Sequence, residues 1–191
     1  MMRRAFALIL LLAGTQAQAA DFGGEARDAV AALVSTVHAA LTDAALTPEA
    51  RDAAVRDAAA EAFALDLWRR AVIGGEDAGF TPAQSAAIDA ALPGWLAGLY
   101  VERFAGAGRK PEVGGVAPAR RDVLVDVTMF RPRGEPLPLD YRVREVDGAP
   151  KVLDVIIGGV SFALLKREEF RAILERGGPE ALIAHLQAGA L

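Results

Sequence analysis

Cysteine is absent from this 191-residue chain, and histidine occurs only twice, at His38 and His185. Without cysteine the folded chain has no disulfide bond, so a hydrophobic core has to supply its stability. A metal site built from two histidines would also need carboxylate ligands, and the sequence pattern places none beside them. We therefore expect no metal site and no cofactor.

Long hydrophobic runs are equally scarce, and the one clear example is at the start of the chain. A basic beginning, MMRR, precedes the apolar stretch AFALILLLAG, and small residues follow at Ala17 and Ala19. This order is typical of a secretory signal peptide that is cleaved after Ala19. The apolar stretch is shorter than the roughly 20 residues that span a bilayer, although a retained anchor is the alternative. We expect residues 1–19 to be a signal peptide and residues 20–191 to be a single exported domain.

Positive charge is in the minority, with 21 basic against 25 acidic residues. Removal of residues 1–19 would take away Arg3 and Arg4 and no acid, which lowers the net charge from −4 to −6. The remaining arginines of residues 131–144 are interleaved with acids and predict a solvated strand face. Nucleic acid is therefore not an expected partner. The chain is nevertheless 53% hydrophobic, which is more apolar material than an ordinary surface needs.

The first half of the chain has helical periodicity. Apolar residues recur at helical spacing over residues 24–41. The stretches TPEA and TPAQ each place a threonine cap before a proline at the first helical position, and predict helices over residues 47–72 and 81–105. Gln84 lies three residues after the second threonine, as a capping box requires. We expect a kink or break at Pro93.

The second half of the chain alternates instead. RDVLVDVTMF and LPLDYRVREV alternate apolar with polar residues, as half-buried strands do, and the turn sequences RPRGEP and DGAP follow them. KVLDVIIGGVSFALL is the longest strand candidate and would be covered on both faces. Its Gly158-Gly159 pair predicts a bulge or a close approach to the backbone. A helix over residues 167–175, a glycine stop and a short helix from Pro179 end the chain.

Helices, then an antiparallel meander, then helices predict an α+β fold. We expect an antiparallel sheet of about four strands packed with several helices, either around an apolar cavity or around a filled core, and the residues alone leave both open.

Most of residues 20–191 resemble the MlaC family, also called toluene-tolerance proteins, weakly at the front and strongly after about Leu137. In that family an Asp, a few apolar residues, Glu-Gly-Val-Ser, Arg-x-x-Phe and a glycine-rich stop occur in this order. The matching residues here are Asp154, Gly159-Val160-Ser161, Arg167, Phe170 and Gly177-Gly178. The motifs P-x-D-Y and L-x-x-x-Y end at Tyr141 and Tyr100. Three departures from the family stand out: Gly158 replaces the Glu, Pro150 replaces a usual Trp, and VIGGEDAG stands where the family has Leu-Gly-x-x-Trp.

The resemblance implies a periplasmic carrier of phospholipid or a related lipid that serves an ABC-type lipid transport system. It also implies two partners, an outer-membrane lipoprotein complex and an inner-membrane ABC lipid transporter complex, and a role in outer-membrane lipid asymmetry. A phospholipid exposes about thirty methylenes, each costing roughly 0.8 kcal/mol in water, so a carrier needs a dry cavity and no catalytic group. Two alternatives stay open: a carrier of another lipid such as a hopanoid, and a ligand-free interaction module.

We expect no enzyme. Ser161 lacks the sharp turn that presents a nucleophilic hydroxyl. Asp126 and Asp154 could each act as the lone acid of a pocket isomerase, but a solvent-facing or backbone-capping role is the simpler interpretation.

The expected lipid-binding residues lie on the sheet and on the third helix. They are Leu96, Leu99, Tyr100, Phe104, Val125, Val127, Tyr141, Val143, Val155, Ile157 and Val160. For each residue ordinary core packing is an equal alternative, and the sequence does not decide which face of the last strand is turned inward.

Overall fold

The computed structural model describes residues 10–75 and 79–189, with side chains from Phe22 onward. The elements are α1 (Leu10–Thr42), α2 (Pro48–Ala62), α3 (Leu65–Ile73), α4 (Pro82–Phe104), β1 (Glu112–Ala119), β2 (Asp122–Met129), β3 (Leu137–Val146), β4 (Ala149–Ile157), β5 (Val160–Ser161) and α5 (Phe162–Ala188). This is the predicted α+β fold, with five strands instead of about four. None of the helices in these residues combines the length and the hydrophobicity that crossing a membrane requires.

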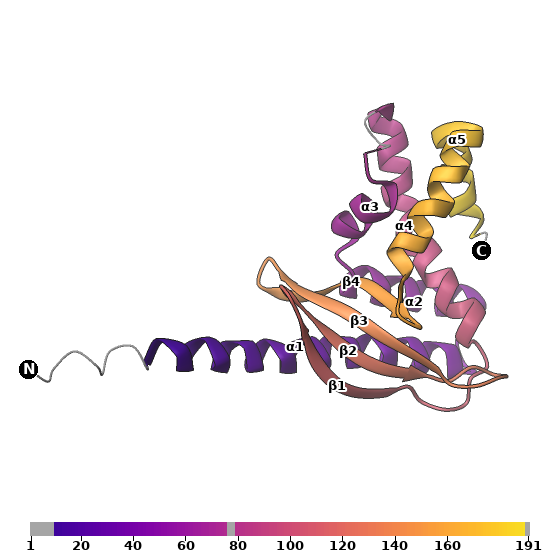
Figure 1. The fold of residues 1–191 in the computed structure, drawn as a ribbon. Coiled ribbons are helices and arrows are strands. Elements are labelled where there is room, and N and C mark those ends of the chain that lie inside the picture. The colour runs from indigo at the N-terminus through magenta and orange to yellow at the C-terminus, as the bar shows by residue number, and fades with distance from the viewer. Residues whose placement is uncertain (1–9, 76–78, 190–191) are drawn as a thin grey trace, which may run out of the picture.

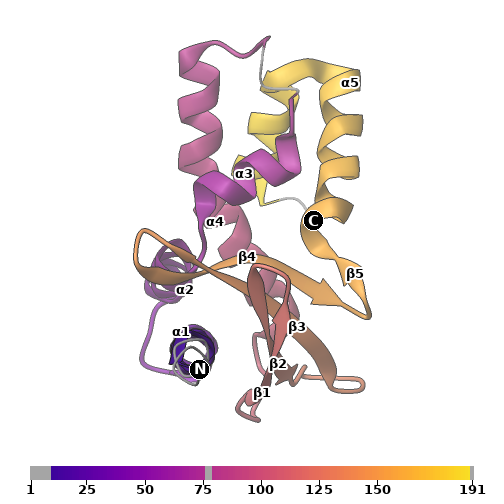
Figure 2. The ribbon, with the colours of Figure 1, turned by 60° about the vertical axis from the view of Figure 1, so that its left-hand side comes forward.

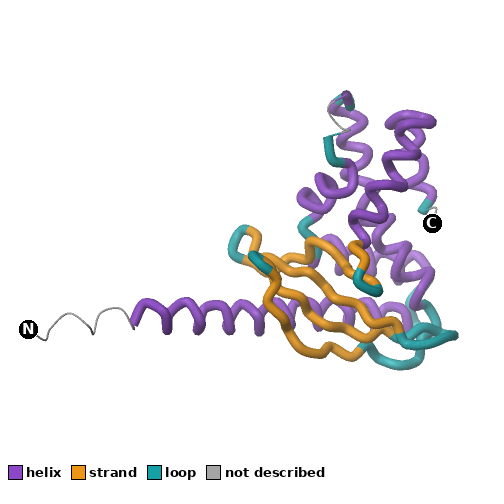
Figure 3. The backbone as a smooth tube through the Cα atoms, in the orientation of Figure 1, coloured by secondary structure: helices purple, strands orange, loops and turns teal. Residues whose placement is uncertain are grey.

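The five strands form one antiparallel meander in the order β1-β2-β3-β4-β5 (Figure 3). The sheet curves around α1, which contacts β1 to β4, while α3, α5 and the first half of α4 form a second group of helices beyond β4 (Figure 2). Val125 pairs with Tyr141, and Tyr141 pairs with Val155, so these three side chains share the inner face of the sheet.

α1 begins at Leu10, well before the predicted start at residue 24. Its N-terminal turns extend away from the rest of the molecule (Figure 1). Residues 1–9 of the expected signal peptide lie outside the described residues. From Ala26 onward one side of α1 is buried against the sheet, at Val30, Val34 and Val37 among others.

The prediction of one helix over residues 47–72 is wrong. α2 ends at Ala62, Phe63 takes an extended conformation (φ −88°, ψ 143°), and α3 begins at Leu65. Phe63 forms a parallel bridge with Val152, and the amide of Ala64 donates a hydrogen bond of 3.0 Å to the carbonyl of Val152. β5 pairs only with the last two residues of β4, so the first part of β4 has an open edge, and the Ala64 amide satisfies the Val152 carbonyl there.

The prediction of one long strand through Gly158-Gly159 is also wrong. β4 ends at Ile157, and both glycines have positive φ, 58° and 81°, as a two-residue hairpin turn requires. β5 is two residues long, and its Ser161 is the N-cap of α5, accepting a hydrogen bond of 3.1 Å from the Leu164 amide. The uncharged residues Val155 to Leu165 of the predicted strand therefore belong to the end of β4, a turn, β5 and the first turn of α5.

Other predictions are confirmed. The expected strands are β2 and β3, and Thr81 and Gln84 form both hydrogen bonds of the capping box. α4 continues through Pro93, and its axis changes direction partway along (Figure 1). The predicted glycine stop is a kink at Gly178 (φ 68°, ψ −168°) within α5. β1 was not predicted, because its EVGGVAPA sequence has few residues that favour strands and is mostly exposed.

Candidate functional site

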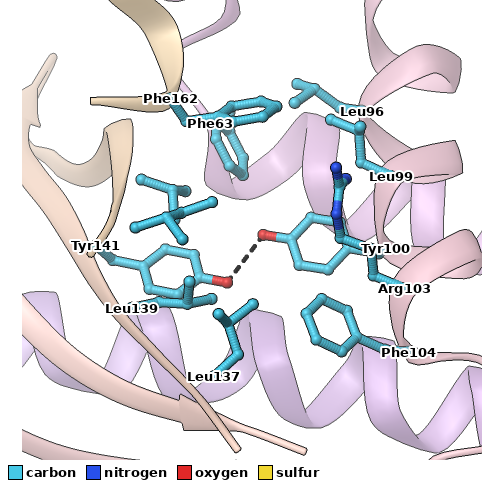
Figure 4. Close-up of a pocket in the computed structure, with 12 residues that line it drawn as sticks. Phe63, Leu96, Leu99, Tyr100, Arg103, Phe104, Leu137, Leu139, Tyr141 and Phe162 are labelled. Carbon is cyan, nitrogen blue, oxygen red and sulfur yellow. Dashed lines mark hydrogen bonds between the residues drawn. The ribbon is translucent and has the colours of Figure 1, made fainter. Parts of the chain in front are cut away.

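An apolar cavity lies between α4 and the inner face of β3 and β4 (Figure 4). Its lining residues are Phe63, Leu96, Leu99, Tyr100, Arg103, Phe104, Leu137, Leu139, Tyr141, Val155, Ile157 and Phe162. Its volume is about 60 Å³, room for only about two water molecules at the roughly 30 Å³ that each occupies in the liquid. Arg103 is exposed and is the one charged side chain of the lining, so it marks the rim of the cavity.

Helical spacing produces the first wall. The five lining residues of α4 lie at positions 96, 99, 100, 103 and 104, which is one face of a helix. Trp95 lies one turn before Leu99, at the edge of this face. The Trp95 ring lies 5.7 Å from Trp68 of α3 and 5.3 Å from Phe170 of α5, so it packs the helices together.

Strand alternation and one bulge produce the second wall. Leu137, Leu139 and Tyr141 occupy alternate positions on β3. The register with β4 shifts after Arg142, which pairs with Asp154, whereas the next residue pairs with Val152. The shift brings both Val152 and Val155 to the inner face, although strict alternation would separate them.

Two tyrosine hydroxyls are the polar groups inside the cavity. The Oη atoms of Tyr100 and Tyr141 are 3.0 Å apart and hydrogen-bonded, and both residues are buried. Burial raises the pKa of Tyr141 to about 12 and raises the pKa of Tyr100 well above its usual value. Both hydroxyls therefore stay protonated at neutral pH and join α4 to β3 across the cavity.

The structure brings seven of the residues expected from the sequence into the lining: Leu96, Leu99, Tyr100, Phe104, Tyr141, Val155 and Ile157. Val125, Val127 and Val143 are on the same face of the sheet but are completely buried and do not line the cavity. Val160 is 57% exposed on β5, because the chain has already turned at Gly158-Gly159.

Five lining residues were missed. Leu139 is two positions before Tyr141 on one strand face, and Arg103 is three positions after Tyr100 on one helix face, so spacing would have found both. Leu137 extends the same strand face. Phe63 and Phe162 had no such signal, because they lie at the break before α3 and at the start of α5.

The two candidate acids are outside the cavity. Asp154 is buried, and its Oδ1 accepts hydrogen bonds from the amides of Val155 (2.8 Å) and Ala163 (2.9 Å), while its Oδ2 accepts one from the Ser161 hydroxyl. Asp154 thus caps the start of α5. Asp126 is exposed on β2. Within residues 10–75 and 79–189 no group of three potential metal ligands comes together.

A larger groove lies between α2, α4 and the end of α5, with a volume of about 730 Å³. Its lining mixes the charged residues Asp52, Arg56 and Glu102 with small residues of α4. Because charged groups line it, this groove does not offer the dry surface that an acyl chain needs. The cavity between α4 and the sheet is therefore the better candidate for an apolar ligand.

Comparison with known proteins agrees with the sequence resemblance. A search of the curated proteins finds no match. The fold is similar to the three-dimensional structure of the phospholipid-binding protein from Ralstonia solanacearum in complex with a phospholipid, at a TM-score of 0.68 and 25% identity. That similarity covers 86% of this chain and 96% of the Ralstonia chain. The sequence pattern of the MlaC protein family matches residues 27–188, and the chain therefore belongs to the MlaC family.

Proposed function

We propose that this protein binds phospholipid and carries it through the periplasm, with acyl chain held between α4 and the sheet. The observation that carries the proposal is the apolar cavity between the two walls, in a chain whose 25%-identical relative is a phospholipid-binding protein. The lining contains no group placed for catalysis, and its function is to keep hydrocarbon out of water. We therefore propose a carrier and not an enzyme.

The cavity has to widen to accept a lipid. A volume of about 60 Å³ is far below the roughly 300–1,000 Å³ of pockets that hold drug-sized ligands. Both walls are apolar, so in water they close on one another, and only a ligand that replaces their mutual contact keeps them apart. Separation of α4 from β4 is the movement that enlarges this space, because the Tyr100–Tyr141 hydrogen bond holds α4 to β3.

Arg103 is placed to meet the phosphate of the lipid. Its side chain lines the rim and makes no ion pair or hydrogen bond with any other residue of the described chain. A phosphate beside the guanidinium would leave the rest of the head group in water, while the acyl chain continues inward past Leu99. The apolar lining and a single rim cation together match an amphiphile with an anionic group.

The cellular context follows from the family and from the N-terminal sequence. Residues 1–19 are proposed to direct export and to be removed, leaving residues 20–191 in the periplasm. The carrier would then exchange lipid with an outer-membrane lipoprotein complex and with an inner-membrane ABC lipid transporter complex.

Extraction of the purified protein tests the proposal. The full chain is expressed with its N-terminal segment in a Gram-negative host, purified from the periplasm without detergent and extracted with organic solvent for mass spectrometry. The expected result is phospholipid at close to one molecule per chain. Another lipid, such as a hopanoid, would overturn the phospholipid assignment, and protein without lipid would favour the ligand-free interaction module.

A further inference from the structure

The Tyr100–Tyr141 pair has one hydroxyl hydrogen more than the protein uses. Two hydroxyl groups have two hydrogens to donate, and the 3.0 Å bond between their oxygens uses one of them. No acceptor for the second hydrogen is present among the described residues. Because both tyrosines are buried, an unused donor there is unfavourable unless a ligand or a water molecule accepts its hydrogen.

The surroundings favour an acceptor on an otherwise apolar molecule. Apart from Arg103 at the rim, the other lining side chains are aliphatic or phenylalanine. Figure 4 shows the two hydroxyls pointing toward one another across the cavity, from α4 and from β3. The spare donor therefore faces space that otherwise suits only hydrocarbon.

The distance between Arg103 at the rim and the tyrosine pair also fits a phospholipid. Tyr100 and Arg103 are three residues apart on α4, so their Cβ atoms are about 5–6 Å apart. In an ester-linked phospholipid the carbonyl groups lie between the phosphate and the hydrocarbon chains. A phosphate at Arg103 would place an ester carbonyl close to the tyrosine pair.

We propose that the Tyr100–Tyr141 pair binds an ester carbonyl oxygen of an acyl lipid by donating its spare hydroxyl hydrogen. The inference rests on the proposed function, because it names the ligand group that the cavity recognises. It also predicts a binding preference. The cavity should bind acyl esters more tightly than ether-linked lipids and polycyclic hydrocarbons, because these have no carbonyl at this position.

A competition between two lipids tests this preference. The delipidated chain is incubated with vesicles that contain equal amounts of diacyl- and dialkylphosphatidylcholine of the same chain length, and the bound lipids are measured by mass spectrometry. We expect the native chain to hold about three to ten times more ester lipid, the range of a single hydrogen bond. The double variant Tyr100→Phe/Tyr141→Phe should hold both lipids equally. Each single variant keeps one hydroxyl, whose hydrogen is then free to donate, and should retain the preference.

Leu139→Val is the matched control, because it alters the same wall without removing a donor. It should weaken the binding of both lipids alike. Infrared spectroscopy of the native chain with a carbonyl-labelled ester lipid gives a second readout that needs no variant, since a hydrogen-bonded carbonyl absorbs at lower frequency.

Two results would overturn the inference. In the first, the native chain binds the two lipids equally and the carbonyl band of the ester lipid is not shifted. In the second, the double variant folds and still prefers the ester lipid. If the native chain binds neither lipid, the proposed lipid-binding function itself is wrong. The experiment therefore distinguishes failure of the proposed function from failure of the carbonyl assignment.

Discussion

Arg103 combines exposure, a place in the cavity lining and the absence of a charged partner among the described residues. Arg103→Glu should lower affinity for an anionic phospholipid about three- to tenfold at low salt, because an attraction at the rim becomes a repulsion. Arg103→Lys should have a small effect. The measurement is a lipid-transfer titration at two ionic strengths, where higher salt should reduce the difference.

Arg56→Glu on α2 is the control for Arg103, since Arg56 lies in the other groove. A loss of affinity as large as that of Arg103→Glu would mean that total charge matters and the rim position does not.

Asp122 provides a test of stability against pH. Its carboxylate is buried at the start of β2 and accepts hydrogen bonds from Arg142 and, at 2.6 Å, Arg144. Burial raises the pKa of Asp122, but the two arginines outweigh it and the pKa lies below its usual value. The stabilisation is therefore present above the unfolded pKa of about 3.9 and is lost as the pH falls through the folded pKa.

Asp122→Asn should lower the free energy of unfolding by about 1–3 kcal/mol at pH 7, because the arginines lose a charged acceptor. Urea unfolding at several pH values should show this difference shrinking below about pH 4. A difference that is constant between pH 7 and pH 2 would contradict the role given to the ionised carboxylate.

Among the elements, the start of α5 depends on Asp154. The carboxylate accepts hydrogen bonds from two amides and one hydroxyl, in the manner of a helix cap. Asp154→Ala should lower the free energy of unfolding by about 1–3 kcal/mol, since buried donors lose their acceptor. Asp154→Asn keeps one acceptor oxygen and should cost less. Equal losses in the two variants, measured by urea unfolding, would contradict a capping role.

Local sequence patterns were sufficient to predict the elements whose boundaries depend only on neighbouring residues. The alternation of β2 and β3 and the capping box at Thr81 are both properties of adjacent residues, and both were predicted. The missed boundaries depend on distant partners. Phe63 leaves the helix because Val152 offers an open strand edge, a contact between residues far apart in the sequence. The Gly158-Gly159 turn was misread because an apolar run does not show where a strand stops.

At the scale of the whole molecule, the sequence identified the inner face of β2 and β3, but not that of β4 and not the part of the sheet that lines the cavity. Val127 and Leu139 are paired on that face, yet only Leu139 lines the cavity. The difference is one of coverage: Val127 is completely buried, whereas Leu139 lines the hollow between α4 and the strands β3 and β4. Coverage by a helix is a tertiary property, so strand alternation alone does not separate cavity from core.

Filling the hollow should block lipid without unfolding the chain. Val155→Trp places a large ring in the cavity, and we expect it to reduce the lipid bound per chain severalfold. Val160→Trp is the matched control, because Val160 is exposed on β5. Occupancy is measured by mass spectrometry and folding by circular dichroism. A Val155→Trp chain that folds and holds as much lipid as the native chain would show that the ligand binds elsewhere.

Photo-crosslinking most directly tests whether the acyl chain lies between α4 and the sheet. The chain is loaded with a phospholipid that carries a diazirine near the end of one acyl chain, irradiated, and digested for peptide mass spectrometry. We predict crosslinks within residues 96–104 of α4 and within β3 and β4. Crosslinks confined to the groove of Asp52 and Glu102, or to the exposed Leu164 and Leu165, would contradict this placement.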